Sequence, residues 1–567
     1  MSSHIYRSPT SISIPRNVNL TQLLHTSACS PPLPPSHLIA KDNLTNRSLT
    51  LGELRSRAGR LANGFTSRLG AQDEARWGLI LPNSVDFIEM VHAVLWTGGV
   101  FCPINHALNA AEIAHGLCIS QPRYLVVYGD VLDKVEEAIA IARDQLKNDQ
   151  AIIWPRPRVL TIVTKRPGYE HVPDDFLEET TLPIPQWKDT STRLASIHLS
   201  SGTTGPPKGA GLTHYNFVAN CYQLYAHDPQ QFHKWSRTVA FTPFVHIAMT
   251  TMPFFFGPWT GMMHHAMPSF DLETFGQLVH SNAATSFQGV PSVVLSLANT
   301  DICERYDFSR AEVVNVGGAP FKQDLLDRLL SRAPWRTIQL YGMTEAAPYV
   351  AYQKLDSVLP NGAAGQLLPG IEAMLKKENT TEDAPQGGPG ELWLRGPNIF
   401  SGYIANDDAN RKGFPLPGWY NTGDLCTITD DRIISVVGRT KELIKYKGFQ
   451  ISPVELEAHL NSHRFVAEAG VGAVWDETQL TELPTAYVVL KPQIFRDKTA
   501  PEKQDALRRI HHHVDRLVSG YKKLRGGVWE VTALPKNATG KLLRKQLGDR
   551  RTGISSLEKK TAPTSRL

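Results

Sequence analysis

The sequence lacks any apolar run long enough to cross a membrane. A spanning helix needs about 20 consecutive apolar residues, and no stretch of 18 or more occurs in this chain. The most apolar segment, residues 252–263, is interrupted by two prolines and two glycines, Pro253, Gly257, Pro258 and Gly261. We therefore expect no membrane span.

Cysteine is scarce, and neither sign of charge dominates. The six cysteines form no Cys-x-x-Cys pair, which excludes a zinc ribbon or a thioredoxin motif and fits a reducing compartment. The 59 Lys and Arg residues nearly balance the 54 Asp and Glu residues, so the net charge is only +5. That excess is too small to indicate nucleic-acid binding. The N-terminus has no apolar core of the kind that a secretory signal needs, so we do not expect secretion.

What the chain does contain is enough apolar sequence for a large core and a regular alternation of strands and helices. Hydrophobic residues make up 41% of the 567 residues. Short apolar runs alternate with helical periodicity, which predicts a mostly parallel sheet covered on both faces. The predicted elements are strands at 77–81 and 124–128 and helices at 87–96, 110–120 and 131–148, and similar units are expected to about residue 435.

A smaller α+β region is expected after this. It should contain helices at 453–462 and from about 502 to 519, the latter stopped by Gly520, and strands at 469–475 and 486–490. We therefore predict a large α/β N-terminal region at 1–437, a small α+β C-terminal domain at 438–551 and an exposed tail at 552–567.

The most informative segment follows a predicted strand at 194–199. It reads Ser-Ser-Gly-Thr-Thr-Gly-Pro-Pro-Lys-Gly over residues 200–209. Glycines allow backbone N–H groups to approach an anion, hydroxyls add donors, and a lysine adds charge, so this pattern predicts a phosphate cradle. Pro207 and Gly209 flank the lysine where a Walker A loop needs Gly and Ser or Thr, and no Gly-x-Ser-x-Gly elbow of an α/β-hydrolase occurs. The alternative, a flexible linker, explains the Pro-Pro-Lys-Gly run poorly.

Several weaker motifs follow in order. They are a turn at 316–320, a strand end at 339–345, a stretch at 419–425 with Asp424 after a turn, a basic stretch at 437–449, and a Pro-Lys-Asn-Ala-Thr-Gly-Lys segment at 535–541. Together with the phosphate cradle, they resemble the adenylate-forming superfamily of acyl-CoA synthetases, luciferases and adenylation domains. The chain most resembles the fungal 4-coumarate:CoA ligase-like acyl-CoA ligases, over residues 6–545.

The resemblance implies a two-step reaction, in which a carboxylate and ATP give acyl-AMP and CoA then displaces AMP. Mg²⁺ would be held by Thr204 and Glu345, and Lys541, Lys208, Glu345 and His246 would be the catalytic residues. Asp424 and Arg439 would bind the ribose and Tyr341 would stack on adenine. The implied ATP and AMP site comprises Ser200, Ser201, Gly202, Thr203, Thr204, Gly205, Lys208, Gly318, Ala319, Gln339, Tyr341, Gly342, Thr344, Glu345, Asp424, Arg439 and Lys541.

Two further sites are implied by the same resemblance. Coenzyme A would be bound by Lys445, Lys447 and Gly448, with Lys441 at the hinge; a solvated charged segment is the alternative for this basic stretch. Gly438 stands where close relatives have an aspartate, which suggests a looser hinge. The acyl substrate would be bound by His246, Gly318, Leu340 and Thr344.

The acyl pocket should be apolar. Ala248 replaces a tyrosine of the hydroxycinnamate enzymes, and Leu340 replaces a glycine. Residues 246–263 contain no Arg or Lys, so a second substrate carboxylate would be buried unpaired. Met249, Met252 and Phe254 to Phe256 would either line the pocket or belong to the core.

The resemblance implies an ATP-dependent acyl-CoA ligase in fungal secondary metabolism, and the apolar pocket residues favour a medium-chain or aryl acid as its substrate. A carrier-protein-loading adenylation enzyme and a luciferase-like oxygenase remain the alternatives. The ending Ser565-Arg566-Leu567 resembles a peroxisomal address, so we expect a peroxisomal import receptor as partner and peroxisomal localisation.

Overall fold

The computed structural model describes residues 4–147, 154–200, 207–289, 293, 296–297, 300–317, 330–331, 335–360, 362–439, 444–446, 449–476, 481–518, 520–536, 542–548, 551 and 553–557. The chain divides into two compact units. Unit 1 comprises residues 1–422 and 427–435, and unit 2 comprises residues 423–426 and 436–567. The predicted domain boundary after residue 437 stays a prediction.

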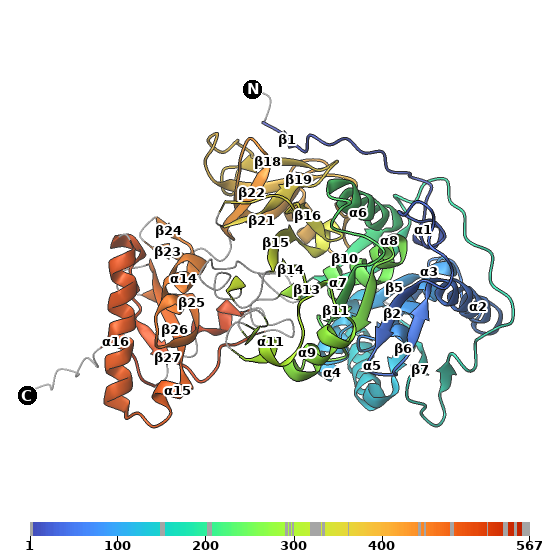
Figure 1. Ribbon diagram of the computed structural model, residues 1–567, viewed down its shortest axis with the longest axis horizontal. Coiled ribbons are helices and arrows are strands. Elements are labelled where there is room, and N and C mark those ends of the chain that lie inside the picture. The colour runs from blue at the N-terminus through green and yellow to red at the C-terminus, as the bar shows by residue number, and fades with distance from the viewer. Residues whose placement is uncertain are drawn as a thin grey trace, which may run out of the picture. The chain divides into compact units, whose positions relative to one another are not determined.

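One sheet of unit 1 carries the strands on either side of the predicted phosphate cradle (Figure 1). Its central strands are parallel, and β10 and β20 pair antiparallel at one edge. Its order is β20 (Gly402–Tyr403), β10 (Lys208–Thr213), β9 (Leu194–Ser200), β5 (Val100–Pro103), β4 (Arg76–Ile80), β6 (Tyr124–Tyr128), β7 (Arg158–Ile162) and β8 (Glu170–Val172).

A larger sheet holds most of the remaining strands. From β2 to β15 it is mainly parallel, and from β15 onward it is antiparallel. Its order is β1 (Tyr6–Arg7), β18 (Glu372–Lys376), β19 (Gly390–Arg395), β21 (Tyr420–Ile428), β22 (Ile433–Arg439), β17 (Ala363–Leu367), β16 (Tyr349–Tyr352), β15 (Arg336–Gly342), β14 (Val313–Val316), β13 (Ser286–Gly289), β11 (Arg237–Ala240), β12 (Met263–Ala266), β2 (Leu38–Asp42) and β3 (Ser48–Thr50).

The expected strand–helix alternation to about residue 435 is therefore wrong beyond β15. Parallel neighbours need a long crossover, whereas antiparallel strands are joined by short connections. Strands β16 to β19 follow one another without a helix among the described residues of 349–395. No helix of the described residues is long and apolar enough to span a membrane.

Several helices of unit 1, among them α2 and α4, begin at polar side chains that accept hydrogen bonds from the backbone amides of the first turn. Thr50 with Glu53 and Asn109 with Glu112 form capping boxes at the starts of α2 and α4, and α2 ends at Gly70 in the left-handed region, φ 64°. The predicted helix at 110–120 and strand at 124–128 have the observed bounds.

The described helices of unit 1 are α1 (Leu20–Leu24), α2 (Leu51–Leu69), α3 (Val85–Trp96), α4 (Ala110–Ser120), α5 (Leu132–Lys147), α6 (His214–His227), α7 (Ile247–Thr250), α8 (Gly257–Thr260), α9 (Leu272–Ser281), α11 (Ile302–Arg305) and α13 (Asp407–Gly413). A π-helix lies at Thr251–Phe256, and 3₁₀ turns lie at Gly129–Val131 and Thr344–Ala346.

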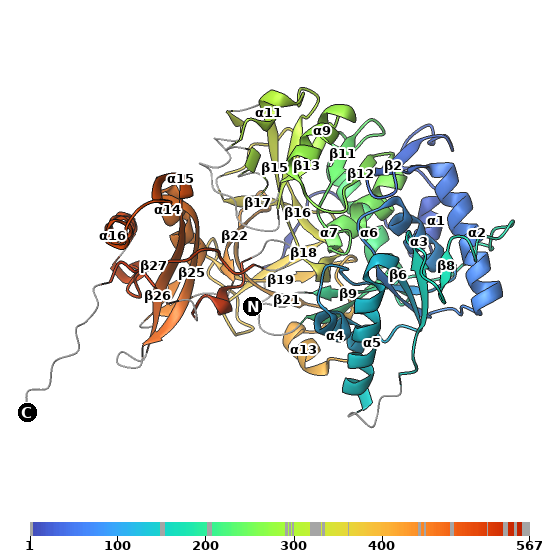
Figure 2. The ribbon, with the colours of Figure 1, turned by 90° about the horizontal axis from the view of Figure 1, so that it is seen from below.

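Helices cover both faces of the sheet that contains β4 and β6 (Figure 2). Leu125 and Val127 of β6 belong to a buried cluster with α4 and α5. Phe65 of α2 packs on Trp77, which stacks on Tyr124. Alternate residues of a strand point to opposite faces, so both faces of this sheet are buried, as the apolar runs predicted.

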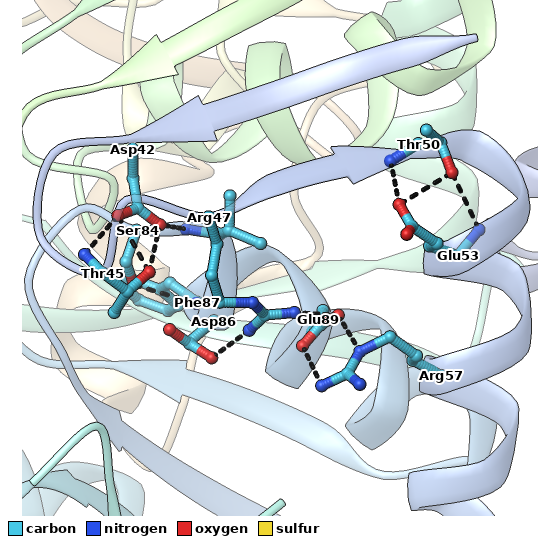
Figure 3. A network of polar contacts seen from close by, with 11 residues as sticks. Asp42, Thr45, Arg47, Thr50, Glu53, Arg57, Ser84, Asp86, Phe87 and Glu89 are labelled. Atoms are coloured by element: carbon cyan, nitrogen blue, oxygen red, sulfur yellow. Dashed lines mark hydrogen bonds and ion pairs between the residues drawn. The ribbon is translucent and has the colours of Figure 1, made fainter. Parts of the chain in front are cut away.

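A charged network ties α2 and α3 to the turn between β2 and β3 (Figure 3). The Arg47 guanidinium contacts Asp86 and donates to Glu89 at 2.8 Å, and Nε of Arg57 donates to Glu89 at 2.5 Å. Burial, opposed by Arg47, raises the pKa of Asp86 to about 6. Two nearly buried carboxylates thus depend on two arginines.

Unit 2 is an α+β region, as expected. Its sheets are β25 (Val466–Asp476), β26 (Thr481–Leu490) and β27 (Val528–Glu530), and the pair β23 (Ile444–Tyr446) and β24 (Phe449–Ile451). Its helices are α14 (Pro453–Ser462), α15 (Pro492–Phe495) and α16 (Ala500–Leu517), with 3₁₀ turns at Gly520–Lys522 and Arg544–Gln546. Gly520 was expected to stop α16, but the helix ends at Leu517 and Gly520 begins the next turn.

Candidate active site

The hairpin of β9 and β10 frames the predicted phosphate cradle. Ser200 is the last residue of β9 and Lys208 the first of β10, and the two are paired across the antiparallel ladder. Ser200 is buried and Lys208 half-buried. The cradle residues Ser201, Gly202, Thr203, Thr204 and Gly205 lie outside the described residues. The structure therefore shows the two ends of the predicted loop, held side by side.

Glu345 lies in the 3₁₀ turn that follows β15, and its side chain accepts a hydrogen bond from Tyr403. The distance from Oη of Tyr403 to Oε1 of Glu345 is 2.8 Å. Nζ of Lys208 lies 5.1 Å from the centre of the Tyr403 ring. The predicted phosphate lysine and metal carboxylate therefore contact the same tyrosine.

Aromatic side chains surround this polar group. Oη of Tyr420 lies 3.0 Å from Oη of Tyr403, and the Phe400 ring lies 4.9 Å and 5.0 Å from the rings of Tyr403 and Tyr420. Burial, reinforced by the Glu345 charge, raises the pKa of Tyr403. Tyr403 therefore remains a neutral donor near neutral pH.

The end of β15 carries the predicted adenine and acyl residues. Val316 of β14 is paired with Gln339 of β15, which brings Gly317 next to Leu340. A Cβ at Gly317 would lie 2.3 Å from Cδ1 of Leu340, so the leucine side chain packs directly on the glycine backbone. Tyr341 and Thr344 are half-buried on the same segment, and Gly342 is exposed. Gly318 and Ala319 lie outside the described residues.

His246 precedes α7 and is exposed, whereas a second histidine, His198, is buried and linked to the same segment. Nε2 of buried His198, on β9, is 2.9 Å from Oγ1 of Thr250 in α7, and the Thr250 amide donates to the carbonyl of His246 at 2.9 Å. Burial, followed by the nearby His246, lowers the pKa of His198 to about 3. A neutral histidine thus links the His246 segment to the strand that leads into the cradle.

The sequence left open whether the apolar residues after His246 line the acyl pocket or belong to the core. Ala248 is half-buried, whereas Met249, Met252 and Phe254 to Phe256 are buried. Phe254 packs on Phe87 and Phe244. The aromatic residues therefore belong to the core.

Asp424 and Arg439 were predicted ribose ligands, and the structure describes them only in part. Asp424 is 1% exposed and belongs to unit 2. It lies within β21, whereas the sequence suggested a position just after a turn; the turn instead precedes the strand. Arg439 ends β22 and Lys445 lies in β23. The side chains of both, together with Lys441, Lys447, Gly448 and Lys541, lie outside the described set.

Comparisons with known proteins identify the family. The model of the AMP-binding enzymes matches residues 34–404, and that of the AMP-binding enzyme C-terminal domain matches residues 455–541. The chain belongs to the AMP-binding enzyme family. It is 30% identical over 533 residues to a probable 4-coumarate–CoA ligase 3 of Dictyostelium discoideum, covering 91% of this chain and 92% of the relative. It is also 30% identical over 511 residues to 4-coumarate–CoA ligase 1 of Petroselinum crispum, covering 89% of each.

Solved structures agree on the fold. The anthranilate CoA ligase AuaEII in complex with anthranoyl-AMP superimposes with a TM-score of 0.82 at 22% identity, over 94% of this chain and 98% of that one. The α/β and α+β expectation is thereby confirmed. The family model and the 4-coumarate–CoA ligase relatives show that the protein is an enzyme of the AMP-forming CoA ligase family, whose substrates include ATP and CoA.

The sequence analysis did not identify two residues of the candidate site, Tyr403 and Tyr420. Tyr420 lies inside the 419–425 motif, where only Asp424 was singled out. Tyr403 had no local signal, because its partners Lys208 and Glu345 are distant in sequence and meet it only through the pairing of β20 with β10.

Proposed function

We propose that this enzyme joins an apolar carboxylic acid, medium-chain or aryl, to coenzyme A. The carboxylate attacks the α-phosphate of ATP, forming acyl-AMP and releasing pyrophosphate; the CoA thiol then attacks the acyl carbon, forming the thioester and releasing AMP. The observation that carries this proposal is the meeting of Lys208 and Glu345 at Tyr403, beside the end of the cradle hairpin.

The residues fit the charges of the first step. Glu345 offers carboxylate oxygen, the ligand type that Mg²⁺ prefers while keeping several waters, and Thr204 would supply a hydroxyl. The described residues contain no cluster of three or more His, Cys, Asp or Glu suited to a metal. Bound Mg²⁺ would neutralise phosphate charge. Lys208 would add a point charge on the phosphates, and Lys541 one between the carboxylate and the α-phosphate.

The residues predicted to line the acyl pocket are the basis for the proposed class of carboxylic acid. Leu340 packs on Gly317, which would narrow one wall of the pocket, and the small side chain of Ala248 would leave space where a tyrosine would fill it. Residues 246–263 offer no cation for a second carboxylate. The relatives named above are 4-coumarate–CoA ligases, which supports an aryl acid as one member of the accepted class.

A panel of carboxylic acids tests the proposal, with pyrophosphate release and CoA thioester formation measured separately. Octanoate and simple aryl acids should be turned over faster than malonate and succinate. Equal turnover of succinate and octanoate would refute the apolar pocket. Pyrophosphate release without thioester would favour loading of a carrier protein, and light emission or oxygen uptake would favour the oxygenase alternative.

Peroxisomal localisation and a role in fungal secondary metabolism complete the proposal. The ending Ser565-Arg566-Leu567 supports the first, while the second follows from the resemblance alone. With a fluorescent protein at its N-terminus, this chain should collect in peroxisomes, and deletion of the three residues should release it. Punctate signal after the deletion would contradict the address.

A further inference from the structure

Tyr403 contacts two side chains of opposite charge, Glu345 and Lys208. Its hydroxyl lies 2.8 Å from Oε1 of Glu345, and its ring faces the Lys208 ammonium at 5.1 Å. No ion pair joins Lys208 to Glu345, both of which the structure describes. A direct pair between them would have to be broken before phosphates and a metal could bind.

The tyrosine is itself held firmly. Its backbone N–H donates to Oδ1 of Asn410 at 2.7 Å, and its carbonyl accepts from Nδ2 of the same side chain at 2.9 Å. Its strand pairs with β10, which begins at Lys208. The side chain therefore has a fixed place relative to the lysine.

The direction of the hydrogen bonds follows from chemistry. An ionised carboxylate only accepts, so the Tyr403 hydroxyl donates to Glu345. The Tyr403 oxygen is then free to accept from Tyr420 at 3.0 Å. This forms a chain from Tyr420 through Tyr403 to Glu345, in which each bond polarises the next.

We propose that Tyr403 is a positioning residue: it keeps the Lys208 ammonium and the Glu345 carboxylate apart and orients Glu345 for the metal that accompanies ATP. This inference rests on the proposed function, which assigns Glu345 to Mg²⁺ and Lys208 to phosphate. Glu345 would hold the ion, and the hydrogen bond from Tyr403 to Oε1 would fix the orientation of that carboxylate.

The test compares metal binding in variants of the full chain. Mn²⁺ replaces Mg²⁺ and is followed by electron paramagnetic resonance with α,β-methylene-ATP, which adenylation cannot cleave. Removal of a group that orients a metal ligand typically costs 10- to 100-fold in metal affinity. Tyr403→Phe should therefore bind Mn²⁺ at least about tenfold more weakly. The Mg²⁺ concentration for half-maximal rate should rise in parallel, with kcat at saturating Mg²⁺ changed less.

A matched control removes an equally buried tyrosine hydroxyl elsewhere. Oη of Tyr124, on β6, donates to the carbonyl of Leu69 at 3.3 Å. Tyr124→Phe should leave Mn²⁺ affinity unchanged. Tyr403→Leu also removes the ring between the charges, so its KM for ATP should rise beyond that of Tyr403→Phe.

Three variants decide the matter. Wild-type Mn²⁺ affinity in a folded Tyr403→Phe would overturn the inference. If that variant does not fold, Tyr420→Phe carries the same test, since it removes the donor to Tyr403 and should weaken Mn²⁺ binding in the same direction. Glu345→Gln separates the two proposals: unchanged Mn²⁺ affinity there would refute the metal assignment of the proposed function, whereas a loss there without a loss in Tyr403→Phe would refute only the role of Tyr403.

Discussion

At the scale of single residues, Leu340 is the predicted acyl-binding residue whose packing the structure describes in most detail. It packs on the backbone of Gly317 so closely that a Cβ there would collide with it. In the proposed acyl pocket, the substrate would have to accommodate this leucine. The substrate range should therefore depend on its size.

Leu340→Gly should enlarge the pocket and shift preference toward bulkier aryl acids. One or a few methylenes in an apolar pocket change discrimination by about 10-fold or more, so kcat/KM for 4-coumarate relative to octanoate should rise by about that factor. Steady-state kinetics on both acids measure the ratio. Leu340→Ala, which adds less backbone freedom than glycine, should shift it in the same direction, and an unchanged ratio in both variants would contradict the prediction.

At the scale of elements, the network of Figure 3 joins α2, α3 and the turn between β2 and β3. The side chains of Asp86 and Glu89 are only 8% and 2% exposed. A buried carboxylate deprived of its partner is costly. This junction should therefore be sensitive to the loss of one arginine.

Arg47→Met should lower the free energy of unfolding by about 3 kcal/mol, because it leaves two neighbouring carboxylates with Arg57 alone. Urea unfolding of unit 1 measures the change. Arg68→Met is the matched control: Arg68 pairs with Glu178 at the surface, with side chains 52% and 26% exposed, and its loss should cost less than about 1 kcal/mol. Equal effects of the two variants would contradict the prediction.

At the scale of the whole molecule, buried neutral histidines should make the fold sensitive to acid. Burial lowers the pKa of each below the ordinary value of 6.5. The values are about 4 for His92, His227 and His264 and about 3 for His198 and His214. The unfolded chain takes up these protons below about pH 6.5 whereas the folded chain does not, so stability falls as the pH drops from there toward 4. Asp86, with its raised pKa, opposes this trend over part of the range, but as a single group.

The thermal midpoint should therefore be lower at pH 5 than at pH 7.5. Below about pH 6.5, each of these histidines should lower the free energy of unfolding by at most about 1.4 kcal/mol per pH unit. Nε2 of His227 lies 2.8 Å from the carbonyl of Tyr352, and a glutamine can replace that donor. His227→Gln should reduce the proton uptake on unfolding by about one. A flat profile between pH 7.5 and 5, or an unchanged uptake in this variant, would contradict the prediction.

The two steps of the reaction should separate between two lysines of unit 2. The resemblance assigns Lys541 to adenylation and Lys447 to thioester formation. Lys541→Ala should lose about 10²- to 10³-fold in adenylation yet convert supplied acyl-AMP and CoA nearly normally. Lys447→Ala should release pyrophosphate but form little thioester. Unfolding midpoints near wild type are the control, and equal loss of both steps in both variants would show that the lysines act in one conformation.

The sequence alone determined the local features of the chain, namely the helices, strands and caps that depend only on residues near one another in the sequence. The apolar periods at 110–120 and 124–128 and the caps around them identify elements correctly, because these signals arise within one turn or one strand. The Gly-, Ser- and Thr-rich stretch between β9 and β10 predicts a phosphate cradle from contiguous chemistry, and that assignment stays a prediction because residues 201–205 lie outside the described residues.

Only the tertiary structure decided which distant residues share a site. Antiparallel pairing after β15 follows from the routing of short connections across the sheet, which apolar periodicity does not encode. The meeting of Lys208, Glu345 and Tyr403 depends on the pairing of β20 with β10 and on a turn after β15. A hydrogen bond between a carboxylate and a phenol acts over about 3 Å, so it exists only once long-range strand pairing has placed the two groups together.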